Sequence, residues 1–165
     1  MKITTTKLDG VLLIELEAFQ DHRGYYVETY NEELYQKNGI GVKFLQDDIS
    51  VSKKNVLRGI HGDSKTDKLI SCLWGEFFFV VIDGRPNSPH FGKWESFTLS
   101  AQNRRQVFVP AGYGNGHCVT SDWAIFHYKQ STYYDPDGQF TYKWNDPRFN
   151  IAWPVKDPVV SKRDT

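Results

Sequence analysis

Residues 56–82 read V-L-R-G-I-H-G-D-S-K-T-D-K-L-I-S-C-L-W-G-E-F-F-F-V-V-I, a stretch that combines a group of charged residues with an apolar run. From Leu69 to Ile82 nearly every residue is apolar or aromatic, which predicts buried strands. The break at Trp74-Gly75-Glu76 is typical of the turn of a hairpin. We therefore expect this run to supply the core of a β-rich protein.

The flanking sequence predicts further short strands and almost no helix. Aromatic residues make up 15% of the chain, with five Trp, nine Tyr and eleven Phe, and they favour strands over helical bundles. Asn31 is expected to cap one helix over 32–37 that stops at Asn38-Gly39, and the glycine-rich segment 112–117 is expected to be a loop. Strands are expected at 11–17, 25–30, 42–52, 94–99, 106–109 and 124–134. These elements together predict an all-β sandwich or jelly roll.

Length and charge limit the possible partners and location. The 165 residues, 19.1 kDa, are enough for one domain over residues 1–165 with a core of its own. Twenty basic and twenty acidic residues cancel, so nothing draws the chain generally to nucleic acid or membranes. Cys72 and Cys118 lack C-x-x-C spacing, which predicts buried free thiols in a reducing compartment. No apolar segment approaches the roughly 18 residues of a membrane span, so a soluble, cytoplasmic protein is expected.

The charged part of the opening stretch places Arg58 and His61 on one predicted strand, followed by two lysines. Strict alternation would point Arg58 and His61 to opposite faces of a sheet, but a bulge at Gly59 can turn both into one cavity. A cation beside an imidazole suggests chemistry on an anion. The alternative is a hydrogen-bonded structural histidine beside a surface arginine.

Common catalytic and metal-binding patterns are not found. The two-histidine, one-carboxylate pattern of metal-binding jelly rolls does not occur. Neither do G-x-S-x-G, a P-loop or G-x-G-x-x-G, which argues against serine hydrolases and common nucleotide folds. Metal-free acid–base chemistry is the remaining prediction. The five histidines stand at positions 22, 61, 90, 117 and 127.

Further motifs give the chain a specific family pattern. They are D-H-R-G-Y-Y-V-E (21–28), S-P-H-F-G-K-W (88–94), Y-K-Q-S-T-Y-Y-D-P (128–136), W-N-D-P-R-F-N-I-A-W-P (144–154) and S-K-R-D (161–164). With V-L-R-G-I-H, their order and spacing resemble the dTDP-4-dehydrorhamnose 3,5-epimerase family over nearly the whole chain. R-G-I-H-G-D with K-T-x-K-L, G-N-x-H and Q-F-T-Y-x-W-N-D look most like the branch acting on GDP-linked 4-keto-heptoses.

The resemblance implies a cupin-type jelly roll that forms a homodimer by exchanging N-terminal strands, with no metal or redox cofactor. It implies an epimerase that inverts C3, C5 or both of a nucleotide-diphosphate 4-keto sugar, either a deoxyhexose or a heptose. The product would be a precursor of a surface polysaccharide such as a capsule.

The resemblance also implies catalytic roles. His61 would be the base and Asp164 its carboxylate partner, and an unperturbed pKa near 6.5 suits a histidine to proton abstraction at neutral pH. Lys68 would face the ketone oxygen, where an enolate develops negative charge. Tyr128 would donate a proton from the opposite face. Because Asp164 is the penultimate residue, this pairing requires the C-terminal segment to be tied down, and Trp153-Pro154 is a candidate for doing so.

The nucleotide diphosphate would be held or bordered by Arg23, Glu28, Gln46, Arg58 and Tyr134. Outside the family pattern, Arg23 would be a turn residue and Gln46 and Tyr134 ordinary strand residues. Asn115 and His117 are expected to bind substrate, although dTDP-sugar members usually carry histidine where Asn115 stands. Asp48 replaces an asparagine of the family and puts a negative charge near the expected diphosphate.

Two other classes of function stay open. A non-catalytic sugar-binding jelly roll would keep the scaffold without exchanging any carbon-bound hydrogen. A metal-dependent cupin, such as a dioxygenase or a phosphosugar isomerase, would contain a metal that elemental analysis detects.

Overall fold

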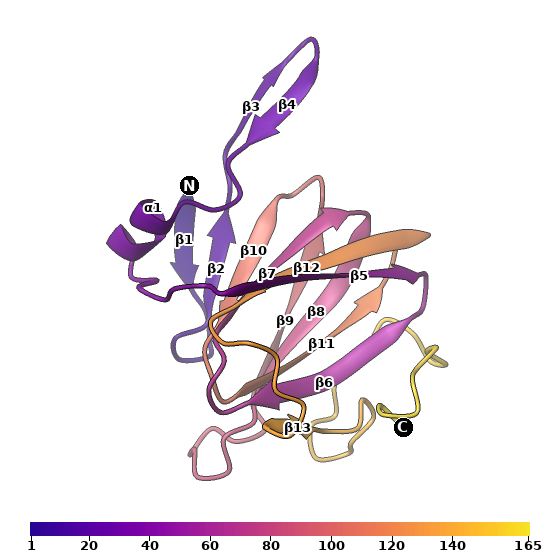
Figure 1. Cartoon of the computed structure of the whole chain (residues 1–165). Coiled ribbons are helices and arrows are strands. Elements are labelled where there is room, and N and C mark those ends of the chain that lie inside the picture. The colour runs from indigo at the N-terminus through magenta and orange to yellow at the C-terminus, as the bar shows by residue number, and fades with distance from the viewer.

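A computed structural model describes residues 1–165, and the chain forms two antiparallel sheets that face each other (Figure 1). The larger sheet has six strands in the spatial order β1 (Lys2–Thr5), β2 (Leu12–Glu15), β10 (Arg105–Val109), β7 (Lys68–Trp74), β12 (Trp123–Gln130) and β5 (Gln46–Lys53). The smaller sheet has five, β13 (Gln139–Thr141), β6 (Leu57–Asp63), β11 (Tyr113–Val119), β8 (Glu76–Asp83) and β9 (Trp94–Ser100). This arrangement is the predicted cupin-type jelly roll.

A hairpin and one helix stand outside the two sheets. The hairpin of β3 (Ala18–Asp21) and β4 (Gly24–Val27) projects away from the body of the molecule (Figure 1). The helix α1 (Glu32–Lys37) begins as predicted, because Oδ1 of Asn31 accepts a hydrogen bond from the Leu34 N–H at 3.1 Å. It packs on the outer face of the larger sheet through a small apolar cluster. No helix is long and apolar enough to cross a membrane.

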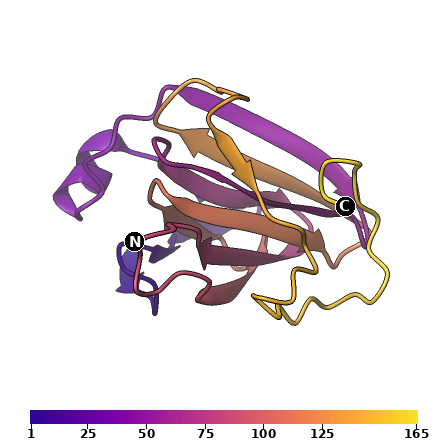
Figure 2. The ribbon, with the colours of Figure 1, turned by 90° about the horizontal axis from the view of Figure 1, so that it is seen from below.

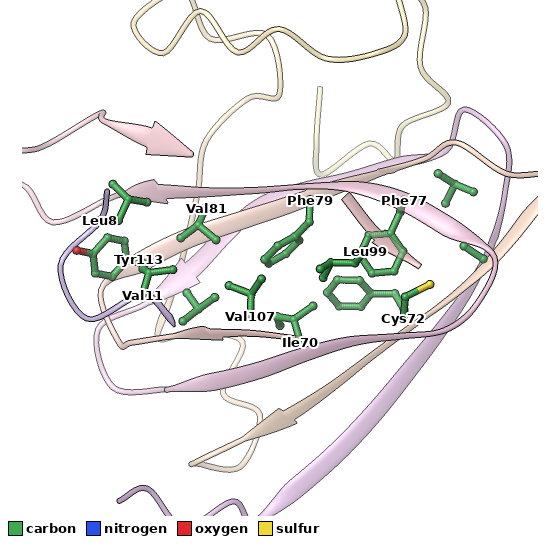
Figure 3. Close-up of a cluster of buried hydrophobic side chains, with 14 residues drawn as sticks. Leu8, Val11, Ile70, Cys72, Phe77, Phe79, Val81, Leu99, Val107 and Tyr113 are labelled. Atoms are coloured by element: carbon green, nitrogen blue, oxygen red, sulfur yellow. The ribbon is translucent and has the colours of Figure 1, made fainter. Parts of the chain in front are cut away.

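The core lies between the sheets (Figure 3), and the predicted run contributes five of the fourteen buried residues in its main cluster. Phe77, Phe79 and Val81 of β8 meet Ile70 of β7 and Val107 of β10, and all five are fully buried. Burial of each such side chain contributes about 1.5–3 kcal/mol before the entropy cost of folding is counted. Residues 69–82 contribute to the core as predicted, but β9, β10, β11 and β12 and the segment before β2 supply the larger part of it.

The prediction that β7 and β8 form a hairpin is wrong. The strand β7 pairs with β10 and β12 in the larger sheet, whereas β8 pairs with β11 and β9 in the smaller one. The chain crosses between the sheets at Gly75, which has φ +71° and whose added Cβ would lie 1.9 Å from the carbonyl oxygen of Trp123. Two consecutive apolar strands have the same pattern in either arrangement, because periodicity does not specify partners.

The glycine-rich segment 112–117 is also not a loop. From Tyr113 it forms β11, a central strand of the smaller sheet between β6 and β8. Its glycines permit close approach, since a Cβ on Gly116 would lie 3.0 Å from the Arg58 carbonyl oxygen. The glycines are therefore a packing requirement of a buried strand rather than turn residues.

Candidate active site

The bulge predicted at Gly59 is present and brings Arg58 and His61 into one cavity. His61 lies opposite Asn115 and Arg58 lies opposite His117, so β6 has one residue more than β11 between these pairs. Gly59 has φ +116°, and an added Cβ would lie 2.6 Å from Cα of Gly116. Only glycine fits this position, and the orientation of both functional side chains depends on it.

The cavity has a volume of about 460 Å³ and lies between β6 and β11 of the smaller sheet and β5, β7 and β12 of the larger one. It contains every predicted site residue except Arg23 and Glu28. Its walls are mostly polar, in contrast to the aromatic core beside it. The lining residues are Gln46, Asp48, Ile49, Ser50, Arg58, His61, Lys68, Asn115, His117, Phe126, Tyr128, Gln130, Tyr134, Gln139, Ser161, Arg163 and Asp164.

His61 and Asp164, which were expected to pair, are joined by a hydrogen bond of 2.6 Å between Nε2 and Oδ1. The other carboxylate oxygen of Asp164 accepts a bond from the Ser161 hydroxyl at 2.7 Å. Because an ionised carboxylate only accepts, Nε2 of neutral His61 carries the proton and Nδ1 is the free basic nitrogen. Burial and the charge of Arg163 lower the pKa of His61, and Asp164 opposes them in part. His61 is therefore neutral at pH 7.

The C-terminal segment that carries Asp164 is tied down, and Figure 2 shows it, in yellow, returning to the two sheets. Val159 forms a bridge to Val56, with hydrogen bonds of 2.9 Å to Asn55 and Leu57. Nearer the end, the Arg163 guanidinium donates to Gln139 Oε1 at 2.6 Å. The expected tie at Trp153 also exists, since its ring packs edge-on against Phe78. These contacts leave Asp164 only 2% exposed.

Lys68 and Tyr128 lie on the larger sheet, across the cavity from His61. The Lys68 side chain is 7% exposed, and its Nζ lies 6.0 Å from the centre of the Tyr128 ring. Burial lowers the pKa of Lys68, and Asp63 partly opposes this. Burial and the nearby Asp48 raise the pKa of Tyr128, so its phenol is protonated at neutral pH.

Polar side chains at the mouth of the cavity form a short network. Gln46 accepts a bond from the Tyr134 N–H at 3.0 Å and donates to Asp48 at 2.7 Å. Gln130 also donates to Asp48, at 2.9 Å, so the carboxylate predicted to be a departure from the family is held by two amides. Separately from this network, Nε of Arg58 donates a hydrogen bond to the Ser52 hydroxyl at 3.1 Å.

Asn115 and His117 point from β11 into the same cavity. Nδ2 of Asn115 donates to the His61 carbonyl oxygen at 3.2 Å, which ties the base to the neighbouring strand. The His117 ring is stacked on Phe126, with ring centres 4.1 Å apart and planes 7° from parallel. Burial, with the neighbouring Arg58 and His61, lowers the pKa of His117 to about 3.

Arg23 and Glu28 do not line the cavity of their own chain. Both are exposed on or just after the projecting hairpin, where the Arg23 guanidinium is paired with Asp21 at 2.5 Å. In the single chain, these two predicted site residues are therefore not brought together with the others.

Several lining residues were not predicted, and Arg163 is the most consequential because it is a cation beside the His61–Asp164 pair. Its position next to Asp164 in S-K-R-D was the available signal. Ser50 and Phe126 could have been found from strand alternation, because they share the inward faces of β5 and β12 with Asp48 and Tyr128.

No group of three or more His, Cys, Asp or Glu side chains is arranged to hold a metal ion.

An imidazole–carboxylate pair faces a phenol and a buried amine across the jelly-roll cavity, and such groups can take up and release protons. Comparison with known proteins identifies the family to which the chain belongs. The family model described as dTDP-4-dehydrorhamnose 3,5-epimerase matches residues 5–165. The dTDP-4-dehydrorhamnose 3,5-epimerase of Escherichia coli strain K12 is 42% identical, over 97% of this chain and 89% of the relative.

Two solved structures are similar throughout. The dTDP-6-deoxy-D-glucose-3,5-epimerase of Legionella pneumophila, in complex with dTDP-4-keto-L-rhamnose, gives a TM-score of 0.94 at 39% identity, over 99% of this chain and 89% of that one. The dTDP-4-dehydrorhamnose 3,5-epimerase of Bacillus anthracis, with TDP and PPi bound, gives 0.95 at 35% identity, over 99% and 95%. The chain belongs to the dTDP-4-dehydrorhamnose 3,5-epimerase family and is an epimerase. These relatives are named for dTDP-linked sugars, not for GDP-linked heptoses.

Proposed function

We propose that this epimerase inverts C3, C5 or both of a nucleotide-diphosphate 4-keto sugar by acid–base chemistry of its own side chains. The observation that carries the proposal is the cavity in which the His61–Asp164 pair faces Lys68 and Tyr128. A hydrogen on a carbon beside a ketone is acidic because its conjugate base is an enolate. Catalysis therefore requires a base, a group that stabilises the enolate oxygen and a proton donor on the other face.

Each requirement has a residue. Nδ1 of His61 takes the proton, and Asp164 stabilises the imidazolium that results. Lys68 places its ammonium where the C4 oxygen gains negative charge, in a largely buried position that strengthens the interaction. Tyr128 returns a proton from the wall opposite His61, because return of the proton by His61 itself would only regenerate the substrate.

The nucleotide diphosphate is assigned to the polar and basic groups around the catalytic centre. Gln46, Arg58 and Tyr134 line the cavity of their own chain, and Arg163 adds a cation near the mouth. We assign Arg23 and Glu28 to the cavity of a second copy, in a homodimer that shares the β3–β4 hairpin. The exposed rings of that hairpin support this assignment, since Phe19 is 79% and Tyr26 68% exposed in the single chain.

The relatives favour a dTDP-linked 4-keto-6-deoxyhexose as the substrate. The second candidate is a GDP-linked 4-keto-heptose, favoured by the motifs R-G-I-H-G-D and G-N-x-H and by Asp48 in the cavity. A carboxylate can accept bonds from both the ring N–H and the amino group of guanine, whereas thymine offers one N–H. Asp48 keeps free acceptor capacity beside its two amide partners.

The test is hydrogen exchange and inversion in D₂O, followed by NMR with each of the two sugar nucleotides. We expect deuterium at C3, C5 or both and formation of the inverted sugar, and we expect His61→Ala to reduce both by roughly 10²- to 10⁴-fold. Binding without exchange would instead identify a sugar-binding jelly roll. Activity that a chelator abolishes and a metal restores would identify a metal-dependent cupin.

We further propose that the product supplies surface polysaccharide synthesis and that the enzyme works in the cytoplasm as one domain. Cys72 and Cys118 are buried free thiols, which supports a reducing compartment.

A further inference from the structure

We propose that His117 determines substrate specificity by hydrogen-bonding the hydroxyl group on C2 of the sugar. The inference rests on the proposed function, because it names a sugar contact in the cavity assigned there. It starts from a buried imidazole that the catalytic roles leave unused.

The His117 ring is held rigidly at the wall of the cavity. It is 4% exposed, stacked on Phe126 and 5.2 Å from the Phe77 ring centre. On β11 it lies opposite Arg58, two positions beyond Asn115, which lies opposite His61. The imidazole therefore occupies the layer of the cavity next to the catalytic base.

The ring also lacks a protein partner. Its Nε2 is fully buried and makes no hydrogen bond, and native proteins rarely leave such atoms unpaired. The residue borders the cavity, so a sugar hydroxyl is the partner that a bound substrate can supply to this ring. With a pKa lowered to about 3 by burial and by Arg58 and His61, the ring stays neutral. A neutral imidazole has one donor and one acceptor, which matches a hydroxyl better than a phosphate.

The chemistry of the substrate indicates which hydroxyl this is. In a 4-keto-6-deoxyhexose C4 is a ketone, C6 is a methyl carbon, the C5 oxygen is in the ring and C1 carries the diphosphate, so only C2 and C3 bear free hydroxyls. Inversion at C3 moves its hydroxyl to the other side of the ring, away from a rigidly held partner. The C2 hydroxyl keeps its configuration throughout and is attached next to C3, the carbon that His61 deprotonates when C3 is inverted.

The experiment compares wild type and His117→Phe on dTDP-4-keto-6-deoxyglucose and its 2-deoxy and 3-deoxy analogues. In wild type, removal of the C2 hydroxyl should lower kcat/KM by roughly 10- to 100-fold, because a buried polar group is left unpaired. His117→Phe keeps a stacked ring and should act on the 2-hydroxy and 2-deoxy sugars about equally. The inference would be overturned if wild type had the same kcat/KM for the 2-hydroxy and 2-deoxy sugars. It would also be overturned if His117→Phe kept the wild-type preference. The inference would also be overturned if His117→Phe lost a preference for the C3 hydroxyl and kept the preference for the C2 hydroxyl.

Two further variants separate recognition from packing. His117→Gln retains a donor and an acceptor without the stack, and it should retain part of the preference for the C2 hydroxyl. His127→Phe is the matched control, because His127 is a partly buried histidine on β12 outside the cavity, near Asp47. It should leave the preference unchanged, and an equal loss in His127→Phe would contradict a role specific to His117.

Binding of non-reactive compounds keeps this test independent of catalysis. Calorimetry with dTDP-6-deoxyglucose and dTDP-2,6-dideoxyglucose, both with a C4 hydroxyl in place of the ketone, measures the same preference without turnover. Preferential binding of the 2-hydroxy compound that His117→Phe abolishes supports the inference even if no sugar is epimerised. Absence of epimerisation of both the dTDP-linked and the GDP-linked 4-keto sugar by wild type would overturn the proposed function alone, whereas equal binding of the 2-hydroxy and 2-deoxy compounds to wild type would overturn the role of His117.

Discussion

Oδ1 of Asp164 lies 2.6 Å from Nε2 of His61, although 103 positions separate the two residues in the chain. The pair exists only because the C-terminal segment returns to the start of β6, where Val159 bridges to Val56. Arg163 comes back with the same segment, so the base receives a carboxylate and a cation from adjacent positions. These two neighbours affect the His61 pKa in opposite directions.

Substitution of these neighbours should shift the acid limb of the pH–rate profile in opposite directions. His61 must be neutral to accept a proton, so kcat/KM is lost as the pH falls through its pKa, which lies below the ordinary 6.5. Arg163→Gln removes a group that lowers this pKa and should move the limb to higher pH. Asp164→Asn removes the group that raises it, so the limb should move to lower pH and the maximal rate should fall roughly 10²- to 10⁴-fold. Profiles that move the same way would contradict this assignment.

Tyr128→Phe should separate deprotonation from inversion. The change keeps the ring beside Phe126 and removes only the phenolic hydroxyl, so the packing loss is small. His61 should still form the enolate, exchange the abstracted proton with D₂O and deliver deuterium to the same face of the sugar. Net inversion loses a positioned acid and should fall by roughly 10²-fold or more beyond any loss of exchange. NMR of one sample in D₂O measures both. An equal fall in exchange and inversion would assign Tyr128 to substrate positioning.

Gly59→Ala should damage both the fold and the site. A Cβ at φ +116° and 2.6 Å from Cα of Gly116 combines backbone strain with a clash between two strands. We expect the free energy of unfolding to fall by about 2–5 kcal/mol, measured by denaturant titration. Gly41→Ala is the control, because nothing lies within 4 Å of an added Cβ there. Wild-type stability in Gly59→Ala would mean that β6 and β11 can separate without cost.

Mixing two inactive variants tests the shared site. If Arg23 serves the cavity of a second copy, a dimer of one Arg23→Ala chain and one His61→Ala chain contains one intact site and one doubly defective site. After random exchange of subunits, about one quarter of all sites should be intact, and activity should recover accordingly. Light scattering gives the oligomeric state in parallel. A fully active monomer, or no recovery after exchange has been demonstrated, would contradict the shared site.

Much of this structure could be predicted from the sequence because the local preferences of several residues agree with the fold. Asn31 caps α1, Gly59 permits the bulge, and the apolar run 69–82 supplies part of the core. Strand pairing was harder to predict from the sequence. The partners of β7 and β8 and the strand nature of 112–117 depend on contacts between distant segments, and Gly75 or Gly116 looks the same in a turn as in a crossing or a close approach.

The site residues could be predicted mainly from the resemblance to the family, and hardly from the local sequence around each residue. Nothing in residues 161–164 by themselves indicates that Asp164 would be buried against His61. Arg163 was overlooked because a basic residue in a polar C-terminal segment is ordinarily a solvated surface residue. The short strands β1 and β13 were missed because a pairing of three or four residues leaves little periodicity to detect.

The two proton-transfer groups belong to different sheets, His61 to the smaller and Tyr128 to the larger. Facing sheets lie about 10 Å apart, which leaves room for a sugar ring between an acid and a base on its two sides. The aromatic core sets that spacing, and Phe126 belongs to both the core and the cavity wall. The size of side chains remote from any ligand thus adjusts the gap across which protons travel, so core substitutions can alter turnover while the protein remains folded.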